Sequence, residues 1–532
     1  MRQAHPYSSK VIIGVFAIAS AGAFLHCVGD AVVQPPVPDG GTEASIPDTS
    51  TGDTSTDTST DAPNPCPAAP TTTFYVNATT GSDSNTGAGP ACAFKTITAA
   101  LTASTDMSHA NATISLAAGN YGVNEVFPLV VNHGRSLVGA GASTTKIQGS
   151  SASFNTSNTN SVLDGLGADG GVSTHFFVTL LVGDVLGGSN NLTATTVSGV
   201  TVLPASNVTV PTTNYLGMVC LAGNGPNTNL TPPLPAPNLI VKGVTVGPNF
   251  DYDVLLGSSP TQQTSCNAAI TTSTFAAANA GILTGACGAA NPNLSWPSSQ
   301  IGDGQVGDAN TFTGTGIGVF IAGCGSMQSV STNHFTSGFR GIVAVSQPAQ
   351  YVEILGNTFD GTTAPFMGIG IQTNSVAVFS KLNDNTFANI SESSAADTGV
   401  GETTGYAIKL GGGHVLQAQR NTISNNDNGI YISGSMAANF DFSSDGNPVN
   451  RNQFYCNSKT LAGNGYDVVL ACSAGNVANF AGNQWDHAGP TTSVSLSTSP
   501  NGTDIATGAS SGANTTSFGA LISTACAAGR VH

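Results

Sequence analysis

The second half of the chain repeats a short pattern of polar and apolar positions. From residue 310 onward, an asparagine, a second polar residue and a large apolar residue recur together at intervals of 23, 24, 28, 36, 31 and 31 residues. Most of these triplets are followed by a run of alternating apolar residues led by glycine, such as GIVAV from Gly341 and GIYISG from Gly429. Alternation with a period of two predicts β-strands. Recurrence at about 20 to 40 residues predicts a solenoid of stacked β-coils.

The stacking of such coils also predicts what lies inside them. The apolar third residues would lie one above another in the interior, and the asparagines would form a hydrogen-bonded ladder at one turn. The stacked positions are Phe312, Phe335, Phe359, Phe387, Ile423, Phe454 and Trp485. Unequal intervals are typical of a parallel β-helix, whose turns accept insertions. Looser repeats upstream predict about eleven to thirteen coils between residues 110 and 490, each about 4.8 Å thick.

The composition favours the same all-β fold class. Only 8% of the 532 residues are charged, and 65 are glycine. A chain that is polar without being charged suits tightly turned β-structure better than helices. The formal net charge of −16 argues against nucleic acid as a partner, since the sequence has no basic stripe.

The N-terminus carries a targeting pattern. Residues 1–26 combine basic residues with the apolar run 11–24 and contain no acidic residue, as is typical of a signal peptide. The stretch FLHC at 24–27 resembles a bacterial lipoprotein box, which predicts lipidation of Cys27. The alternative is cleavage after Ala23 and secretion, because the residue before Cys27 is not the usual glycine or alanine.

Residues 27–70 are rich in Thr, Ser, Asp and Pro and have no apolar periodicity. Such a segment cannot bury enough apolar surface to fold, so we expect a disordered tether. The lipid anchor would be the only contact with a membrane, and it would hold the folded part at the bacterial outer membrane or cell surface.

Ten cysteines in an exported chain imply disulfides. Proximity in the sequence suggests three pairs, Cys66–Cys92, Cys266–Cys287 and Cys456–Cys472.

The start of the folded region carries four short motifs. They are Gly81-Ser82-Asp83, Phe94-Lys95-Thr96-Ile97, Gly119-Asn120-Tyr121 and Phe127-Pro128. In this order they resemble a bacterial domain-of-unknown-function family that forms the first coils of pectate-lyase-like proteins. The resemblance implies a right-handed parallel β-helix whose open end is covered by a short N-terminal capping helix at 96–103. We therefore expect a cap and first coils at 71–150, the β-helix at 151–490, and a last coil or C-terminal cap at 491–532.

Pectate-lyase-like proteins include calcium-dependent lyases and glycoside hydrolases, but the hydrolase motifs are absent here. The best catalytic candidates are Asp384, Lys409 and Arg420, with His414 nearby in sequence: Lys409 or Arg420 would act as base, and Asp384 would face a cation. Three carboxylates within about 6 Å on one face would favour an enzyme.

A metal candidate is the glycine-rich stretch GDGQVGDANTF, which contains Asp303 and Asp308. Its spacing lacks the ligand positions of an EF-hand, and a plain turn is favoured. No cofactor is expected, although the resemblance would allow calcium.

The favoured function is non-catalytic binding of a polysaccharide or cell-envelope glycan, or adhesion; the alternative is a polysaccharide lyase or glycoside hydrolase. Thr358, Thr386 and Thr422 belong to an outward column of uncharged residues between the asparagines and the stacked apolar residues, suited to sugar hydroxyls. The unequal repeat intervals predict that this column is too ragged to match a regular lattice such as ice. Tyr431 belongs to a second outward column, shared with Phe320, Val343, Gly370 and Lys409.

Overall fold

The chain divides into two compact units, Met1–Pro63 and Asn64–His532. The computed structural model describes only residues of the second unit: 66–70, 72–105, 109, 111–132, 134–150, 177–183, 194–206, 215–221, 239–257, 266–286, 298–314, 316–323, 327–346, 351–362, 367–373, 378–391, 405–411, 414–434, 440–457, 466–472, 477–486, 492–493, 504–507, 512–514 and 526. The predicted signal peptide, Cys27 and the part of the expected tether up to residue 65 lie outside the described residues.

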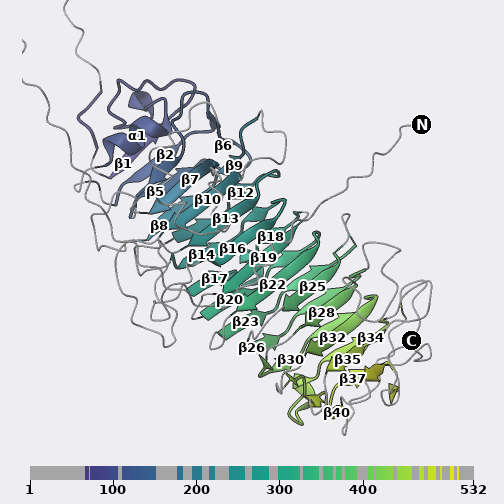
Figure 1. Ribbon diagram of the computed structural model, residues 1–532. Helices are drawn as coiled ribbons and strands as arrows, with labels where there is room; N and C mark the ends of the chain where they lie inside the picture. Colours follow the sequence, from purple (N-terminus) through teal and green to yellow (C-terminus); the bar gives the residue numbers. More distant parts are fainter. Residues whose placement is uncertain are drawn as a thin grey trace, which may run out of the picture. The chain divides into compact units, whose positions relative to one another are not determined.

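The second unit is a parallel β-helix built from three stacked sheets (Figure 1). Sheet A contains β1 (Thr73–Val76), β2 (Thr113–Leu116), β5 (Ser136–Gly139), β8 (Thr195–Ser198), β11 (Leu239–Lys242), β14 (Ala268–Thr271), β17 (Ser298–Ile301), β20 (Met327–Ser331), β23 (Tyr351–Leu355), β26 (Val378–Asn383), β29 (His414–Val415), β30 (Ala418–Gln419), β33 (Phe440–Asp441), β36 (Val477–Asn479) and β40 (Gly512–Asn514).

Sheet B contains β3 (Gly119–Tyr121), β6 (Thr145–Gln148), β9 (Thr201–Leu203), β12 (Thr245–Val246), β15 (Thr274–Phe275), β18 (Thr311–Phe312), β21 (His334–Phe335), β24 (Thr358–Asp360), β27 (Thr386–Ala388), β31 (Thr422–Ser424), β34 (Gln453–Tyr455) and β37 (Gln484–Trp485).

Sheet C contains β4 (Leu129–Val131), β7 (Phe177–Gly183), β10 (Tyr215–Leu221), β13 (Tyr252–Gly257), β16 (Ala280–Ala286), β19 (Ile317–Gly323), β22 (Arg340–Ser346), β25 (Ile369–Thr373), β28 (Tyr406–Leu410), β32 (Asn428–Gly434), β35 (Val468–Cys472), β39 (Ile505–Thr507) and β38 (Thr492–Ser493).

Each coil visits the sheets in the order A, B, C, as β20, β21 and β22 do, and then returns to sheet A at β23. Every strand pairs in parallel with the corresponding strand of the next coil, so residues about one coil apart in sequence become neighbours. The predicted right-handed parallel β-helix is confirmed. Among the described residues, no helix is long and apolar enough to cross a membrane.

Stacked phenylalanines fill the interior behind sheet B. The ring centroids of Phe312, Phe335, Phe359 and Phe387 follow one another at 4.6, 4.7 and 4.6 Å, with nearly parallel planes. All four rings are almost completely buried. Because successive side chains of a strand face opposite sides, the residue before each ring must face outward. The predicted stack is present.

The asparagine ladder is also present, at the turn between sheets A and B. Its seven members are fully buried: Asn310, Asn333, Asn357, Asn385, Asn421, Asn452 and Asn483. From Asn333 onward, the backbone N–H and the side-chain Nδ2 of each asparagine donate to the Oδ1 of the next, as Asn357 does to Asn385 at 3.0 and 3.1 Å. Asn310 donates to Asn333 through its Nδ2. Nδ2 of Asn357 also donates to the carbonyl of Val330. The amides thereby satisfy backbone groups that the turn leaves unpaired.

Helix α1 (Ile97–Ala103) lies against β1, β2 and β4, where the first coils begin (Figure 1). Thr96 caps it, and its first two N–H groups donate to the buried carboxylate of Glu125 at 2.7 and 2.8 Å. Asp83 accepts from the N–H groups of Lys95 and Thr96. The first two motifs of the N-terminal resemblance therefore meet in one hydrogen-bonded cap. Short 3-10 helices among the described residues lie in connections: η1 (Pro90–Cys92), η5 (Val306–Asp308) and η6 (Pro448–Asn450).

The described disulfides correct two of three predicted pairs. Cys66–Cys92 forms as expected, but Cys266 pairs with Cys220 and Cys456 pairs with Cys526. The partners are 46 and 70 residues apart. Sequence proximity failed because stacking makes neighbours of residues in different coils.

Candidate functional site

Sheet B presents a straight outward column of uncharged polar side chains, which we call the threonine column. In strand order, its members are Thr201, Thr245, Thr274, Thr311, His334, Thr358, Thr386, Thr422, Gln453 and Gln484. Every step is in register, so the column is not ragged, contrary to the expectation. The unequal sequence intervals do not disturb it, because the extra residues are inserted in connections outside the two- and three-residue strands of sheet B.

Three hydroxyl groups of this column, those of Thr358, Thr386 and Thr422, are open for hydrogen bonding, whereas the Thr201 hydroxyl donates to the carbonyl of Ala142. Thr358, Thr386 and Thr422 are half-buried between a fully buried asparagine and a fully buried apolar residue, which fixes their orientation. Within the described part of the chain, none of these three hydroxyls has a hydrogen-bond partner. Further along, Gln453 donates to Gln484 at 3.0 Å. Neighbouring rungs of a parallel sheet lie about 4.8 Å apart, so the hydroxyls form a regular array.

Tyr431 does not lie with these threonines. It belongs to the outer column of sheet C, whose members over five strands are Phe320, Val343, Gln372, Lys409 and Tyr431. Gln372 stands where we expected Gly370. That prediction was wrong because Gly370 faces the interior, where a Cβ atom would come within 2.8 Å of the Phe387 ring. Tyr431 is 8% exposed.

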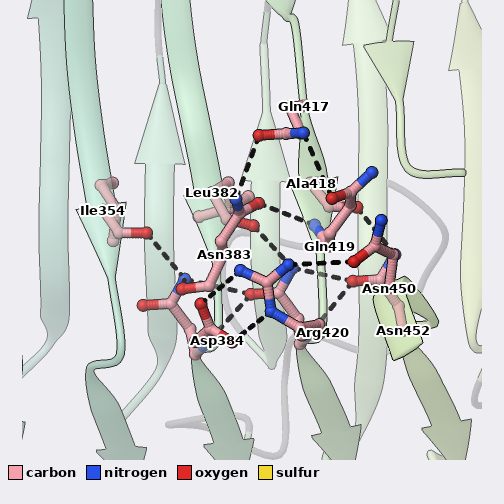
Figure 2. Close-up of polar contacts among 12 residues, drawn as sticks. Ile354, Leu382, Asn383, Asp384, Gln417, Ala418, Gln419, Arg420, Asn450 and Asn452 are labelled. Atoms are coloured by element: carbon pink, nitrogen blue, oxygen red, sulfur yellow. Dashed lines mark hydrogen bonds and ion pairs between the residues drawn. The ribbon is translucent and has the colours of Figure 1, made fainter. Parts of the chain in front are cut away.

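The structure brings Asp384 and Arg420 together but places Lys409 on another sheet. Lys409 lies in sheet C, with its Nζ 5.5 Å from the ring centroids of both Tyr406 and Tyr431. Asp384 and Arg420 lie at the turns between sheets A and B (Figure 2). His414 begins β29 in sheet A, and its side chain is outside the described part.

Asp384 and Arg420 instead form an exposed ion pair (Figure 2). Nε and Nη2 of Arg420 donate to the two carboxylate oxygens of Asp384 at 2.6 and 2.7 Å, and Nη1 donates to Asn450 at 3.2 Å. The hydrogen bonds that Arg420 donates to Asp384 raise the pKa of Arg420 above its usual value. A general base must be deprotonated before it can accept a proton from the substrate. The ion pair with Asp384 favours the protonated form of Arg420 and therefore opposes the catalytic role considered for this residue.

Asp303 and Asp308 lie in a turn that is held by hydrogen bonds within the chain. Oδ1 of Asp303 accepts from the N–H of Gln305 at 2.8 Å, and Asp308 ends the short helix η5. Among the described residues, no third acidic residue, His or Cys joins these two in a group that could hold a metal.

One group of three carboxylates does converge, at residues that sequence reasoning did not select. The carboxylates of Asp467, Asp486 and Asp504 have oxygens within 4.8 Å of one another. Oxygen ligands of this kind suit calcium. A second group joins Asp486 to Cys456 and Cys526, but these cysteines form a disulfide and offer no thiolate.

Unlike the carboxylates of an open active site, two members of this acidic group are hardly exposed to solvent. Asp467 and Asp504 are each 4% exposed, and Asp467 accepts from Nδ2 of Asn457 at 2.7 Å. Burial, together with the charges of Asp486 and Asp504, raises the pKa of Asp467 well above its usual value. The three carboxylates are closer together than the separation of about 6 Å that would favour an enzyme. Two of them, however, are buried. Asp467 and Asp504 precede in-register strands, so a correct alignment of β32, β35 and β39 could have found them.

The comparisons with known proteins agree with the N-terminal motifs. Residues 79–224 match a family described as "Protein of unknown function (DUF1565)". This match confirms the resemblance that the four motifs indicate. No curated protein matches the chain.

Two solved structures are similar in fold at 12% sequence identity. The A-module of mannuronan C-5 epimerase AlgE6 from Azotobacter vinelandii has a TM-score of 0.32, with 81% of this chain and 94% of that chain covered. ORF18 of Geobacillus virus E2 has a TM-score of 0.24, with 85% and 62% covered. At such scores neither similarity bears on function.

Proposed function

We propose that this chain is an exported, surface-tethered protein that binds polysaccharide without transforming it, and that the threonine column is its binding face. The observation that carries the proposal is the in-register array of half-buried hydroxyls at Thr358, Thr386 and Thr422, which lack partners in the described part of the chain.

A polysaccharide suits this array for two physical reasons. Its hydroxyls both donate and accept hydrogen bonds, as the threonine hydroxyls do. It is also a repeating polymer, so one chain laid along the column can engage several rungs at once. Each hydrogen bond contributes only about 0.5–1.5 kcal/mol, and useful affinity therefore needs several rungs together.

The cysteine chemistry supports export. Disulfides persist in oxidising compartments and are rare in the cytosol. Three disulfides join described residues, and one of them, Cys66–Cys92, lies where the expected tether meets the folded unit. Attachment through Cys27 at the bacterial outer membrane or cell surface, with secretion as the alternative, extends this proposal.

The alternative function is a polysaccharide lyase or glycoside hydrolase. The convergence of Asp467, Asp486 and Asp504 is the observation that favours it. The burial of Asp467 and Asp504 weighs against it, because a substrate must reach catalytic carboxylates. The separation of Lys409 from Arg420 weighs against it as well.

The experiment mixes the purified protein with a panel of polysaccharides, with and without calcium, and measures retention and released products in the same sample. Binding predicts retention of the intact polymer with no shortened or unsaturated products in either condition. Calcium-dependent products would replace binding with catalysis, and absence of retention across the panel would contradict polysaccharide binding.

A further inference from the structure

Arg340, the first residue of β22, lies on the outer face of sheet C. The next residue, Gly341, faces the interior, since a Cβ atom there would come within 2.6 Å of the Phe359 ring. Leu216 and Tyr406, which are in register with Arg340 along sheet C, belong to apolar clusters separate from the main core. This position, and with it the Arg340 side chain, therefore faces outward. Its neighbours in register are Ile317 and Ile369.

The Arg340 guanidinium has no anionic partner among the described residues. Its central carbon lies 4.4 Å from the centroid of the Phe339 ring. Its Nε is buried and, within the described part of the chain, makes no hydrogen bond. Ile317 and Ile369 can supply no charge. Burial lowers the pKa of Arg340 from its usual value, although an arginine stays protonated at neutral pH.

A half-buried cation without a partner is unfavourable, and folded proteins normally pair such groups. Arg420, which is more exposed, already has a bidentate carboxylate partner in Asp384. We propose that Arg340 anchors an oxyanion-binding subsite on the outer face of sheet C, and that the ligand supplies the missing carboxylate, sulfate or phosphate group.

The chemistry of guanidinium selects this ligand class. Its planar donors match the paired oxygens of a carboxylate, sulfate or phosphate. Contact of the guanidinium with the Phe339 ring adds cation–π attraction and leaves the edge donors for a ligand. Residues in register with Arg340 on other strands of sheet C are also uncharged: Leu216, Tyr252, Ala280, Ile317, Ile369 and Tyr406. This subsite lies on a different sheet from the threonine column and goes beyond the proposed function.

The test uses the whole protein in two arms. In the first, native gels contain dextran sulfate, carboxymethyl cellulose or uncharged dextran. In the second, inorganic phosphate is titrated by calorimetry. The variants are Arg340→Met and, as the matched control, Arg420→Met.

A charged polymer in the gel should retard the parent protein and the Arg420→Met variant equally. If Arg340→Met binds that polymer at least about tenfold more weakly, the subsite is assigned to a polymer-borne anion. The same pattern with phosphate alone assigns it to a free anion. If the parent protein binds neither, or if Arg340→Met binds as well as the parent, the proposal is overturned. Retention by uncharged polysaccharides is a separate readout, so failure here and failure of the proposed function are distinguishable.

Stability separates this role from a structural one. Removing an uncompensated charge should leave the Tm of ligand-free Arg340→Met unchanged or raised. A lowered Tm with unchanged anion binding would make Arg340 a structural residue and overturn the proposal. If Arg340→Met fails to fold, Arg340→Lys replaces it, because lysine keeps the charge but lacks the planar, forked donors of guanidinium. Arg340→Lys should weaken anion binding about tenfold at an unchanged Tm.

Discussion

Truncation of one rung of the asparagine ladder should destabilise the β-helix far more than truncation of its half-buried neighbour. Asn385 is 1% exposed and lies in the middle of the ladder. Its Nδ2 donates to the carbonyls of Ile354 and Asn383 and to Oδ1 of Asn421 at 2.9 to 3.0 Å. Its Oδ1 accepts from the backbone N–H and the Nδ2 of Asn357. The variant Asn385→Ala removes all of these bonds.

The magnitude follows from the groups that are left behind. An unpaired buried donor or acceptor costs about 1–3 kcal/mol, and the backbone N–H of Asn357 and the carbonyl of Ile354 lie in the buried ladder. Partial relaxation reduces the sum, so we expect the free energy of unfolding to fall by about 3–5 kcal/mol. With a urea slope of about 3 kcal/mol/M, the midpoint would fall by roughly 1–1.7 M.

The control is Thr386→Ala, one residue later on the same rung. Thr386 is half-buried, and its hydroxyl has no partner in the described part of the chain, so we expect a loss of less than about 1 kcal/mol. Urea unfolding followed by circular dichroism compares the two variants. Equal losses for Asn385→Ala and Thr386→Ala would refute the claim that the ladder amides stabilise the turn.

Three further changes test other parts of the fold. Gly341→Ala should lower the Tm measured by calorimetry, because the new Cβ would lie 2.6 Å from both the Phe359 ring and the carbonyl of Gly370. Such overpacking costs about 1–3 kcal/mol. An unchanged Tm would contradict tight packing of Gly341 against the phenylalanine stack. The raised folded pKa of Asp467 makes its contribution to stability fully present below its unfolded pKa and lost as pH rises through the folded value. Asp467→Asn should therefore raise the Tm at pH 8, change it little at pH 4 and flatten its pH dependence, whereas an unaltered Tm–pH curve would contradict the burial of this charge. Arg420→Gln breaks an exposed ion pair and should cost less than about 1 kcal/mol in urea unfolding while leaving polysaccharide retention intact; loss of retention would place Arg420 in the binding site.

The triplet repeat was enough to predict the interior of the β-helix. A buried amide ladder and a ring stack depend on residues that occupy equivalent places in every coil, so the local pattern at Asn357 and Phe359 carries the information. The threonine column followed from the same alignment. Its regularity did not follow, because interval lengths in sequence do not say in which connection the extra residues lie.

Other features depend on contacts that a linear pattern does not encode. Strict alternation fails in sheet C because Gly341 and Ile342 both face the interior, which shifts the outer column from Gly370 to Gln372. The pairing of Cys220 with Cys266 and the meeting of Asp467 with Asp504 each join different coils. The lack of a partner for Arg340 in the described part of the chain could be seen only once its surroundings were known.

The most direct test of the threonine column compares two triple variants on affinity gels that contain a polysaccharide retained by the parent protein. The first, Thr358→Val, Thr386→Val and Thr422→Val together, replaces three hydroxyls with methyl groups of similar shape. The matched control is Thr73→Val, Thr113→Val and Thr196→Val together, because these threonines are also half-buried and precede buried residues, but lie in sheet A. The column variant should bind at least about tenfold more weakly, with the control unchanged. Equal retention of both triple variants, or a parent protein that no polysaccharide retains, would contradict glycan binding by this face.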